Sequence, residues 1–107
     1  MAARRLRRAA YGSSLHAYLL LLEAFVQERI GAPEFEVIFL RLYKNDPELW
    51  SPGVFEILES LFGAVDEYCS DPHLREETGG LSDEDLRAAA VSALENLERV
   101  IDAGVTF

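Results

Sequence analysis

The chain has 107 residues, half of them hydrophobic, which is enough for one folded domain and excludes a disordered acidic tail. Its formal net charge is −9, from 19 acidic and 10 basic residues. We expect so acidic a chain to repel nucleic acid and anionic membranes and to attract basic proteins.

Residues 1–12 carry four arginines and no acid, and we predict a disordered basic extension there. A targeting peptide is the alternative, because RRLRR precedes the apolar run AYLLLLEAFV. Glu23 interrupts that run, however, and no small-residue cleavage site follows. We therefore predict one domain over residues 13–107 of a cytoplasmic protein. A single cysteine, Cys69, fits a reducing compartment, and no run approaches the ~18 apolar residues of a membrane span.

The first predicted helix runs from Ser14 to Ile30, with Ser13 or Ser14 as its N-cap and Gly31 as its stop. Its apolar residues recur at the i, i+3, i+4, i+7 spacing of one helical face: Leu15, Tyr18, Leu19, Leu22, Phe25, Val26 and Ile30.

The second predicted helix begins at Pro33 and ends at Asn45-Asp46-Pro47, since a residue before proline is disfavoured in a helix. Its apolar pattern consists of Phe35, Ile38, Phe39, Leu42 and Tyr43.

The third predicted helix begins at Ser51 and Pro52 and ends at Asp71-Pro72, where a loop follows. It carries a broad apolar stripe of Val54, Phe55, Leu58, Leu61, Phe62, Val65 and Cys69.

The fourth predicted helix begins at Ser82, with Asp85 completing a variant of the capping box, and ends at Gly104. Its apolar seam is Leu86, Ala90, Ala93, Leu97 and Val100 or Ile101. Four amphipathic helices with short loops predict an all-α fold, an antiparallel four-helix bundle. The aromatic residues are predicted to fill its core: Phe25, Phe35, Phe39, Phe55 and Phe62.

The chain shows no pattern typical of a catalytic or metal site. Neither His16 nor His73 has a nucleophile or carboxylate at a diagnostic spacing, and Cys69 with His73 supplies only two zinc ligands. Residues 71–82 fail the calcium-loop pattern at four positions. Ser60 in ESL is similar to the phosphopantetheine site of acyl carrier proteins, but that serine belongs at a helix start. We expect no enzyme, no metal and no cofactor.

The stretch from residue 66 to residue 86 holds eight carboxylates and one cation, Arg75. The acids at the start of the fourth helix complement its dipole and have a structural explanation: Asp83, Glu84 and Asp85. Asp66 and Glu67 lie instead in the last turns of the third helix, where a negative charge costs about 0.3–1 kcal/mol. Residues that break a local rule in this way tend to mark functional sites.

The acids of the third helix are predicted to share one face, within about a third of its circumference: Glu56, Glu59, Asp66 and Glu67. Asp71, Glu76 and Glu77 would extend this face across the loop. Tyr68, in the middle, could offer a partner an apolar ring and a hydroxyl. The alternative is an acidic face that only keeps the protein soluble.

Several motifs occur together in the second half of the chain: Tyr43-Lys44-Asn45-Asp46, Trp50-Ser51, Phe55-Glu56-Ile57-Leu58, Leu61-Phe62, DEYCSDPHLR at residues 66–75, and SDEDLR at residues 82–87. With them, residues 15 to 97 resemble the colicin D immunity protein family of bacterial self-protective colicin-like immunity. DEYCSDPHLR is the most specific part. Gly53 and Val54 depart from the family by replacing what is usually a pair of acids, and residues 1–12 have no counterpart.

The resemblance implies an immunity protein, without catalytic activity, that covers the basic active-site cleft of a toxin's nuclease domain. That toxin is typically a ribonuclease that cleaves tRNA. The implied charge contacts are Glu56, Glu59, Asp66, Glu67 and Asp71, with Tyr68 as anchor. Arg75 also matches the family pattern, and we expect it to form an internal tie to a nearby carboxylate or helix C-terminus. Cys69, Pro72 and Leu74 match as well, and we expect them to serve packing and the turn. We expect a monomer that binds no nucleic acid and no membrane. The alternatives are an acidic adaptor for another basic protein and an acyl-carrier-like module.

Overall fold

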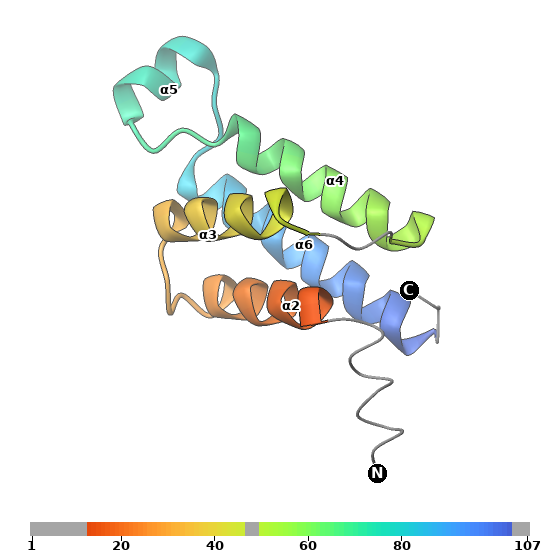
Figure 1. Cartoon of the computed structure of the whole chain (residues 1–107). Coiled ribbons are helices and arrows are strands. Elements are labelled where there is room, and N and C mark those ends of the chain that lie inside the picture. The colour runs from red at the N-terminus through yellow and green to blue at the C-terminus, as the bar shows by residue number, and fades with distance from the viewer. Residues whose placement is uncertain (1–12, 47–49, 104–107) are drawn as a thin grey trace.

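The structure is a computed structural model that describes residues 13–46 and 50–103. The predicted extension at residues 1–12 and the predicted stop at Gly104 lie outside the described residues. Within the described ranges the chain forms five helices and no strand, which confirms the all-α class (Figure 1). The helices are α2 (Ser13–Val26), α3 (Ala32–Lys44), α4 (Pro52–Glu67), α5 (Pro72–Thr78) and α6 (Asp83–Asp102). The finer class of antiparallel four-helix bundle stays a prediction.

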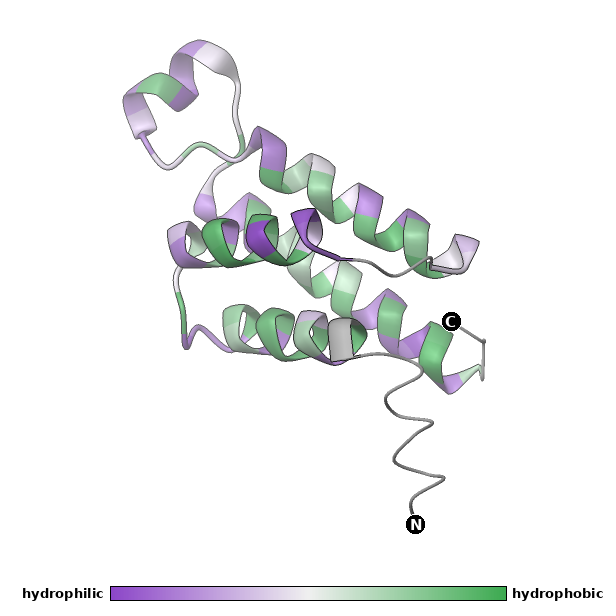
Figure 2. Cartoon of the chain, viewed as in Figure 1, coloured by the Kyte–Doolittle hydropathy of each residue, from purple (hydrophilic) through white to green (hydrophobic). Residues whose placement is uncertain are grey.

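Helix α6 packs against three of the other helices, α2, α3 and α4. Its buried residues are those of the predicted seam, Leu86, Ala90, Ala93 and Leu97. Figure 2 shows apolar residues gathered where these four helices meet, whereas α5 is largely hydrophilic. None of the described helices is long and apolar enough to cross a membrane.

A series of stacked aromatic rings, here called the aromatic ladder, joins α2, α3 and α4. Phe35, Phe39 and Tyr43 follow one another on α3 with ring centroids 5.9 and 5.6 Å apart. Phe25 of α2 stacks on Phe35 at 4.5 Å, and Phe62 of α4 stacks on Tyr43 at 5.1 Å. Each such pair adds about 0.5–1.5 kcal/mol beyond the burial of its area. The ladder therefore fixes α3 between its two neighbours.

Asp46, just beyond α3, accepts hydrogen bonds from two aromatic side chains. The hydroxyl of Tyr18 donates at 2.9 Å and the indole Nε1 of Trp50 donates at 2.8 Å, both to Asp46 Oδ2. Burial, reinforced by this hydrogen bond to Asp46, raises the pKa of Tyr18, which stays protonated. These two hydrogen bonds give Asp46 and Trp50 a structural role, because they join α2 to the segment before α4.

Helix α2 ends at Val26, four residues before the predicted end at Ile30. Glu28 adopts a φ of 61°, in the left-handed region, and the N–H of Arg29 donates to the carbonyl of Ala24 at 2.8 Å. That bond closes the helix in the way a glycine usually does. The end was missed because glutamate gives no such signal in the sequence.

Gly31 was predicted to stop the first helix, and in the structure it instead forms the N-cap of α3. Its N–H donates to Oε1 of Glu34 at 2.9 Å, and Pro33 lies in the first turn as predicted. A Cβ at Gly31 would lie 2.7 Å from that same oxygen, so a larger residue here would require the Glu34 carboxylate to move.

Two apolar residues assigned to the helix patterns from sequence lie on the surface. The side chain of Phe55 is 51% exposed and that of Ile38 is 40% exposed. The core prediction is right for Phe25, Phe35 and Phe39, and Phe62 is partly buried against that core. Phe55 lies outside the core because the buried residues of α4 occupy another part of its circumference: Val54, Leu58, Leu61 and Val65.

Candidate functional site

The four acids predicted to share a face of α4 are all exposed: Glu56, Glu59, Asp66 and Glu67. From the first to the last, the helix rises by about 16 Å. No lysine or arginine in the described part of the chain forms an ion pair with any of them. Their charge is thus not neutralised from within these residues.

Glu59 is oriented by Tyr43, a half-buried residue of α3 that packs against the core. The hydroxyl of Tyr43 donates to Oε2 of Glu59, and the ring of Tyr43 is part of the aromatic ladder through its stacking on Phe62. A half-buried side chain of α3 therefore positions a surface carboxylate on α4. Glu56, Asp66 and Glu67 have no side-chain hydrogen bond to the described residues.

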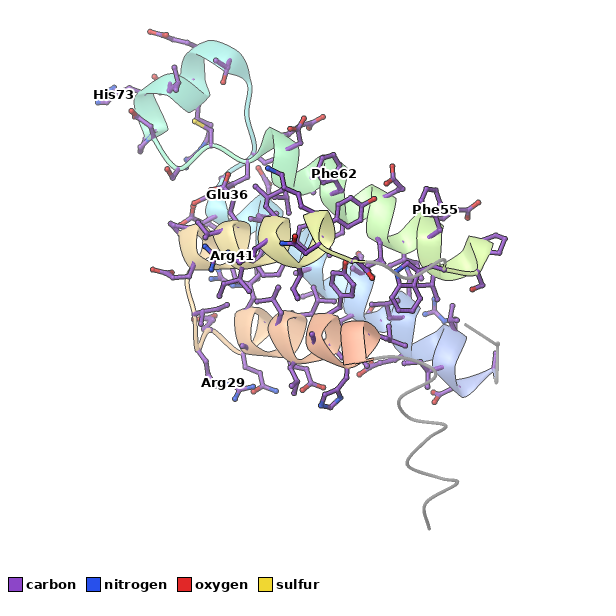
Figure 3. The ribbon with its side chains drawn as sticks, viewed as in Figure 1. Arg29, Glu36, Arg41, Phe55, Phe62 and His73 are labelled. Carbon is purple, nitrogen blue, oxygen red and sulfur yellow. The ribbon has the colours of Figure 1, made fainter. Side chains whose placement is uncertain are left out.

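After α4 the chain makes an excursion, residues 69–80, that contains the unpredicted helix α5. Asp71 is its N-cap and accepts from the N–H groups of His73 at 3.0 Å and Leu74 at 3.5 Å, both through Oδ1. The helix ends at Gly79 with a φ of 75°. Figure 1 shows α5 projecting from the other helices, with His73 on its far side in Figure 3. Asp71-Pro72 was expected only to end a helix, and in fact it starts this one.

The base of the excursion is closed by backbone hydrogen bonds. The N–H of Cys69 donates to the carbonyl of Leu81 at 3.0 Å, and the N–H of Leu81 donates to that of Glu67 at 2.8 Å. Arg75 donates through Nε and Nη2 to the carbonyl of Cys69, at 3.1 and 2.9 Å. Its Nη2 also lies 4.0 Å from Oδ1 of Asp83. These contacts confirm the internal tie expected of Arg75.

Tyr68, predicted as an exposed anchor, is buried with 7% of its surface exposed. Its hydroxyl donates to Oδ1 of Asp83 at 2.8 Å. Burial raises the pKa of Tyr68, and the hydrogen bond to Asp83 and the charges of Asp83 and Glu36 raise it further. The tyrosine stays protonated and joins the end of α4 to the start of α6, so its expected exposure is wrong.

Replacing Tyr68 by phenylalanine tests this internal role. Tyr68→Phe keeps the buried ring and removes only the donor to Asp83, so we expect the free energy of unfolding to fall by about 1 kcal/mol. Urea unfolding followed by circular dichroism measures the change. An unchanged midpoint would show that the hydrogen bond adds nothing to stability.

Asp66 and Glu67 line a depression of about 520 Å³ between the end of α4 and the returning segment of the excursion, with Gly79 and Gly80 on its other side. A Cβ at Gly80 would lie 2.9 Å from Cβ of Cys69 and 3.0 Å from the carbonyl oxygen of Glu67. Only glycine permits so close an approach. Gly80 therefore allows the returning segment of the excursion to pack beside these two acids.

The acids at the start of α6 are largely used within the fold. The N–H of Asp85 donates to Oγ of Ser82, and the N–H of Ser82 donates to Oδ2 of Asp85, both at 3.1 Å. This capping box confirms the prediction, and its hydrogen bond from the Ser82 backbone lowers the pKa of Asp85. Asp83 is held by Tyr68, whereas Glu84 is exposed.

Sequence reasoning missed Glu36, which α3 brings close enough to raise the pKa of Tyr68 (Figure 3). No local pattern distinguishes this acid from the other glutamates, since its position follows only from the packing of α3. The structure also moves Cys69 from the predicted apolar stripe to a half-buried position beyond the end of α4.

The described residues hold no group of three or more histidine, cysteine or acidic side chains that could bind a metal ion. Ser60 is exposed in the interior of α4, as predicted, and not at a helix start where a phosphopantetheine serine belongs. The chemically distinctive feature of the described surface is therefore its charge.

The family described as bacterial self-protective colicin-like immunity matches residues 13–97. No curated protein and no solved structure matches the chain. The matched residues contain α2 to α5 and most of α6, including all the acids considered above.

Proposed function

The chain belongs to the family of bacterial self-protective colicin-like immunity proteins, and from this premise we propose that it neutralises a cognate toxin by binding it. The toxin we propose is a colicin D-like ribonuclease that cleaves tRNA. A nuclease cleft must be positive to hold phosphates. Fixed carboxylates on a helical surface can occupy the same cleft as a partial mimic of the nucleic-acid backbone, through charge-assisted hydrogen bonds.

The observation that best supports this proposal is the state of the acids on α4. Glu56, Glu59, Asp66 and Glu67 are exposed, and no described lysine or arginine pairs with them. A cationic partner can therefore use their full charge. Asp71 is exposed as well, although one of its oxygens already caps α5, so we keep it as a contact at the edge of the surface.

We assign Tyr68 a supporting role in place of the exposed anchor role predicted from the sequence. Because it is buried and bonded to Asp83, it supports the surface from below instead of contacting the toxin. Arg75 acts in the same way, by holding the excursion against the end of α4. These two residues keep the acidic side chains in place.

The crowding of like charges has a functional explanation in this proposal. Carboxylates that repel one another in the free protein are stabilised when cations arrive, so repulsion relieved on binding adds to affinity. Long-range attraction also raises the association rate, which matters when a free nuclease is lethal to the cell.

The protein acts in the cytoplasm as a monomer, it needs no cofactor, and it carries out no catalytic step. The antiparallel four-helix bundle is the architecture we propose for its rigid support. Inhibition then requires only that the toxin cleft stays covered.

The experiment that tests the proposal uses the nuclease domain of the toxin encoded beside this chain. We expect one immunity protein per toxin domain to stop tRNA cleavage. We also expect the association rate to fall at least about tenfold between about 20 mM and 500 mM salt, because salt screens the attraction.

Stopped-flow fluorescence and a tRNA cleavage assay provide the two readouts. If the complex forms but tRNA cleavage continues, the proposed inhibition of a tRNase is wrong. If no complex forms, while another basic protein of the host is bound, the adaptor alternative is favoured.

A further inference from the structure

One stripe of α4 alternates aromatic and acidic side chains. Phe55, Glu59, Phe62 and Asp66, here called the α4 stripe, follow at i, i+4, i+7 and i+11. At about 100° per residue they lie within about 60° of the helix circumference. Figure 3 shows Phe55 and Phe62 both projecting from α4. The stripe therefore presents rings and carboxylates in turn along one line.

The stripe is open to solvent where it would meet a partner. Phe55 is 51% exposed, Glu59 and Asp66 are exposed, and Phe62 is half-buried. The Tyr43 side chain supports the stripe from α3, because its ring stacks on Phe62 and its hydroxyl donates to Glu59. The exposed ring of Phe55 is available to a partner and lies outside the core.

Rings alternating with carboxylates suit arginine better than lysine. A guanidinium group is planar, so it can lie over a ring and still donate several hydrogen bonds to a neighbouring carboxylate. Side chains at i and i+4 on a helix lie next to one another. An arginine over Phe55 would thus reach Glu59, and one beside Phe62 would reach Glu59 or Asp66.

The molecule already contains one contact of this kind. The guanidinium carbon of Arg87 lies 4.8 Å from the centroid of the Phe25 ring, and its Nε donates to the carbonyl of Phe25 at 3.4 Å. This internal pair shows a guanidinium over a phenylalanine while hydrogen-bonded to an oxygen of the same residue. On the α4 stripe the oxygens are carboxylates, which are stronger acceptors.

We propose that the α4 stripe docks arginine side chains of the basic partner, with Phe55 as the ring that selects arginine over lysine. The inference rests on the proposed function, since it assumes a cationic partner for this surface. Beyond the proposed function, it specifies that the surface prefers arginine to lysine side chains. Phe55 takes the anchor role that the sequence had suggested for Tyr68.

The test measures binding of two probes, hexa-arginine and hexa-lysine peptides, to the full chain at low salt. We expect the arginine peptide to bind about 3–10-fold more tightly. Its side-chain proton resonances should shift upfield through the ring current of Phe55. Phe55→Leu should keep the affinity for lysine and lose most of the preference for arginine, whereas the matched control Phe55→Tyr should keep the preference.

Three outcomes would overturn the inference: no preference in the wild type, an unchanged preference in Phe55→Leu, or no binding of either peptide. The proposed function is judged separately, with the neighbouring toxin domain. If the wild type and Phe55→Leu bind that domain equally well, the proposed function is retained, and the proposal that the α4 stripe docks arginine side chains is wrong. If the wild type does not bind the domain, the proposed function itself fails.

Discussion

Replacing Asp66 and Glu67 by lysine is expected to weaken binding of the toxin domain by about 100-fold or more, because two attractive contacts become repulsive. The fold should tolerate the change, since both side chains are exposed at the C-terminal end of α4. A lysine there complements the helix dipole and should add about 0.3–1 kcal/mol to stability. Titration calorimetry with the toxin domain and urea unfolding of the free variant measure the two effects.

The control variant is Glu95→Lys combined with Glu98→Lys, two exposed acids of α6. It changes the net charge by the same amount and leaves the α4 acids intact. We expect it to slow association and to weaken binding by less than about tenfold. Equal losses of affinity in both variants would mean that only the total charge of the protein matters and that Asp66 and Glu67 do not form a specific contact site. Full protection of cells by the α4 variant would exclude these residues from the interface.

The start signals of the helices could be predicted from sequence because they are local. Pro33, Pro52 and Ser82 each lie at the predicted helix start, and each depends only on residues within one turn. The seam of α6 was predictable for a related reason. The buried residues of α6 recur at the i, i+3 and i+4 spacing of one helical face, and this spacing can be identified directly in the sequence.

Burial at the edge of an apolar stripe could not be predicted in the same way. Periodicity gives the direction of the apolar face, but the packing of the neighbouring helices decides how much of it is covered. Phe55 and Ile38 lie at such edges, and both are exposed. Tyr68 shows the opposite error, because an acidic run suggested exposure, while the return of the chain at Leu81 closes over the region.

Helix α5 was missed because seven residues are too few to show a period. Its start signal, Asp71-Pro72, was interpreted only as the end of the previous helix, although aspartate before proline is also a good N-cap sequence. The excursion nevertheless holds the candidate site together, through Arg75 and the close approach of Gly80. The acids could thus be identified from sequence, whereas the support that positions them could not.

Truncation of Phe39 to alanine is expected to lower the free energy of unfolding by about 3–5 kcal/mol. Phe39 is fully buried, and its ring lies 5.9 Å from those of Tyr18 and Phe35 and 5.6 Å from that of Tyr43. The loss combines the buried area, the cavity and the interrupted aromatic ladder. It would remove a large part of the about 5–15 kcal/mol that stabilises a typical domain.

Phe55→Ala is the matched control, because it removes the same side chain from a position that is 51% exposed. We expect it to change stability by no more than about 0.5 kcal/mol. Chemical denaturation of both variants at equal protein concentration measures the difference. A loss of 3 kcal/mol or more in Phe55→Ala would restore the core position predicted from sequence, and the α4 stripe would then lose its only strongly exposed ring. A small loss in both variants would instead show that the aromatic ladder does not hold α3 between α2 and α4.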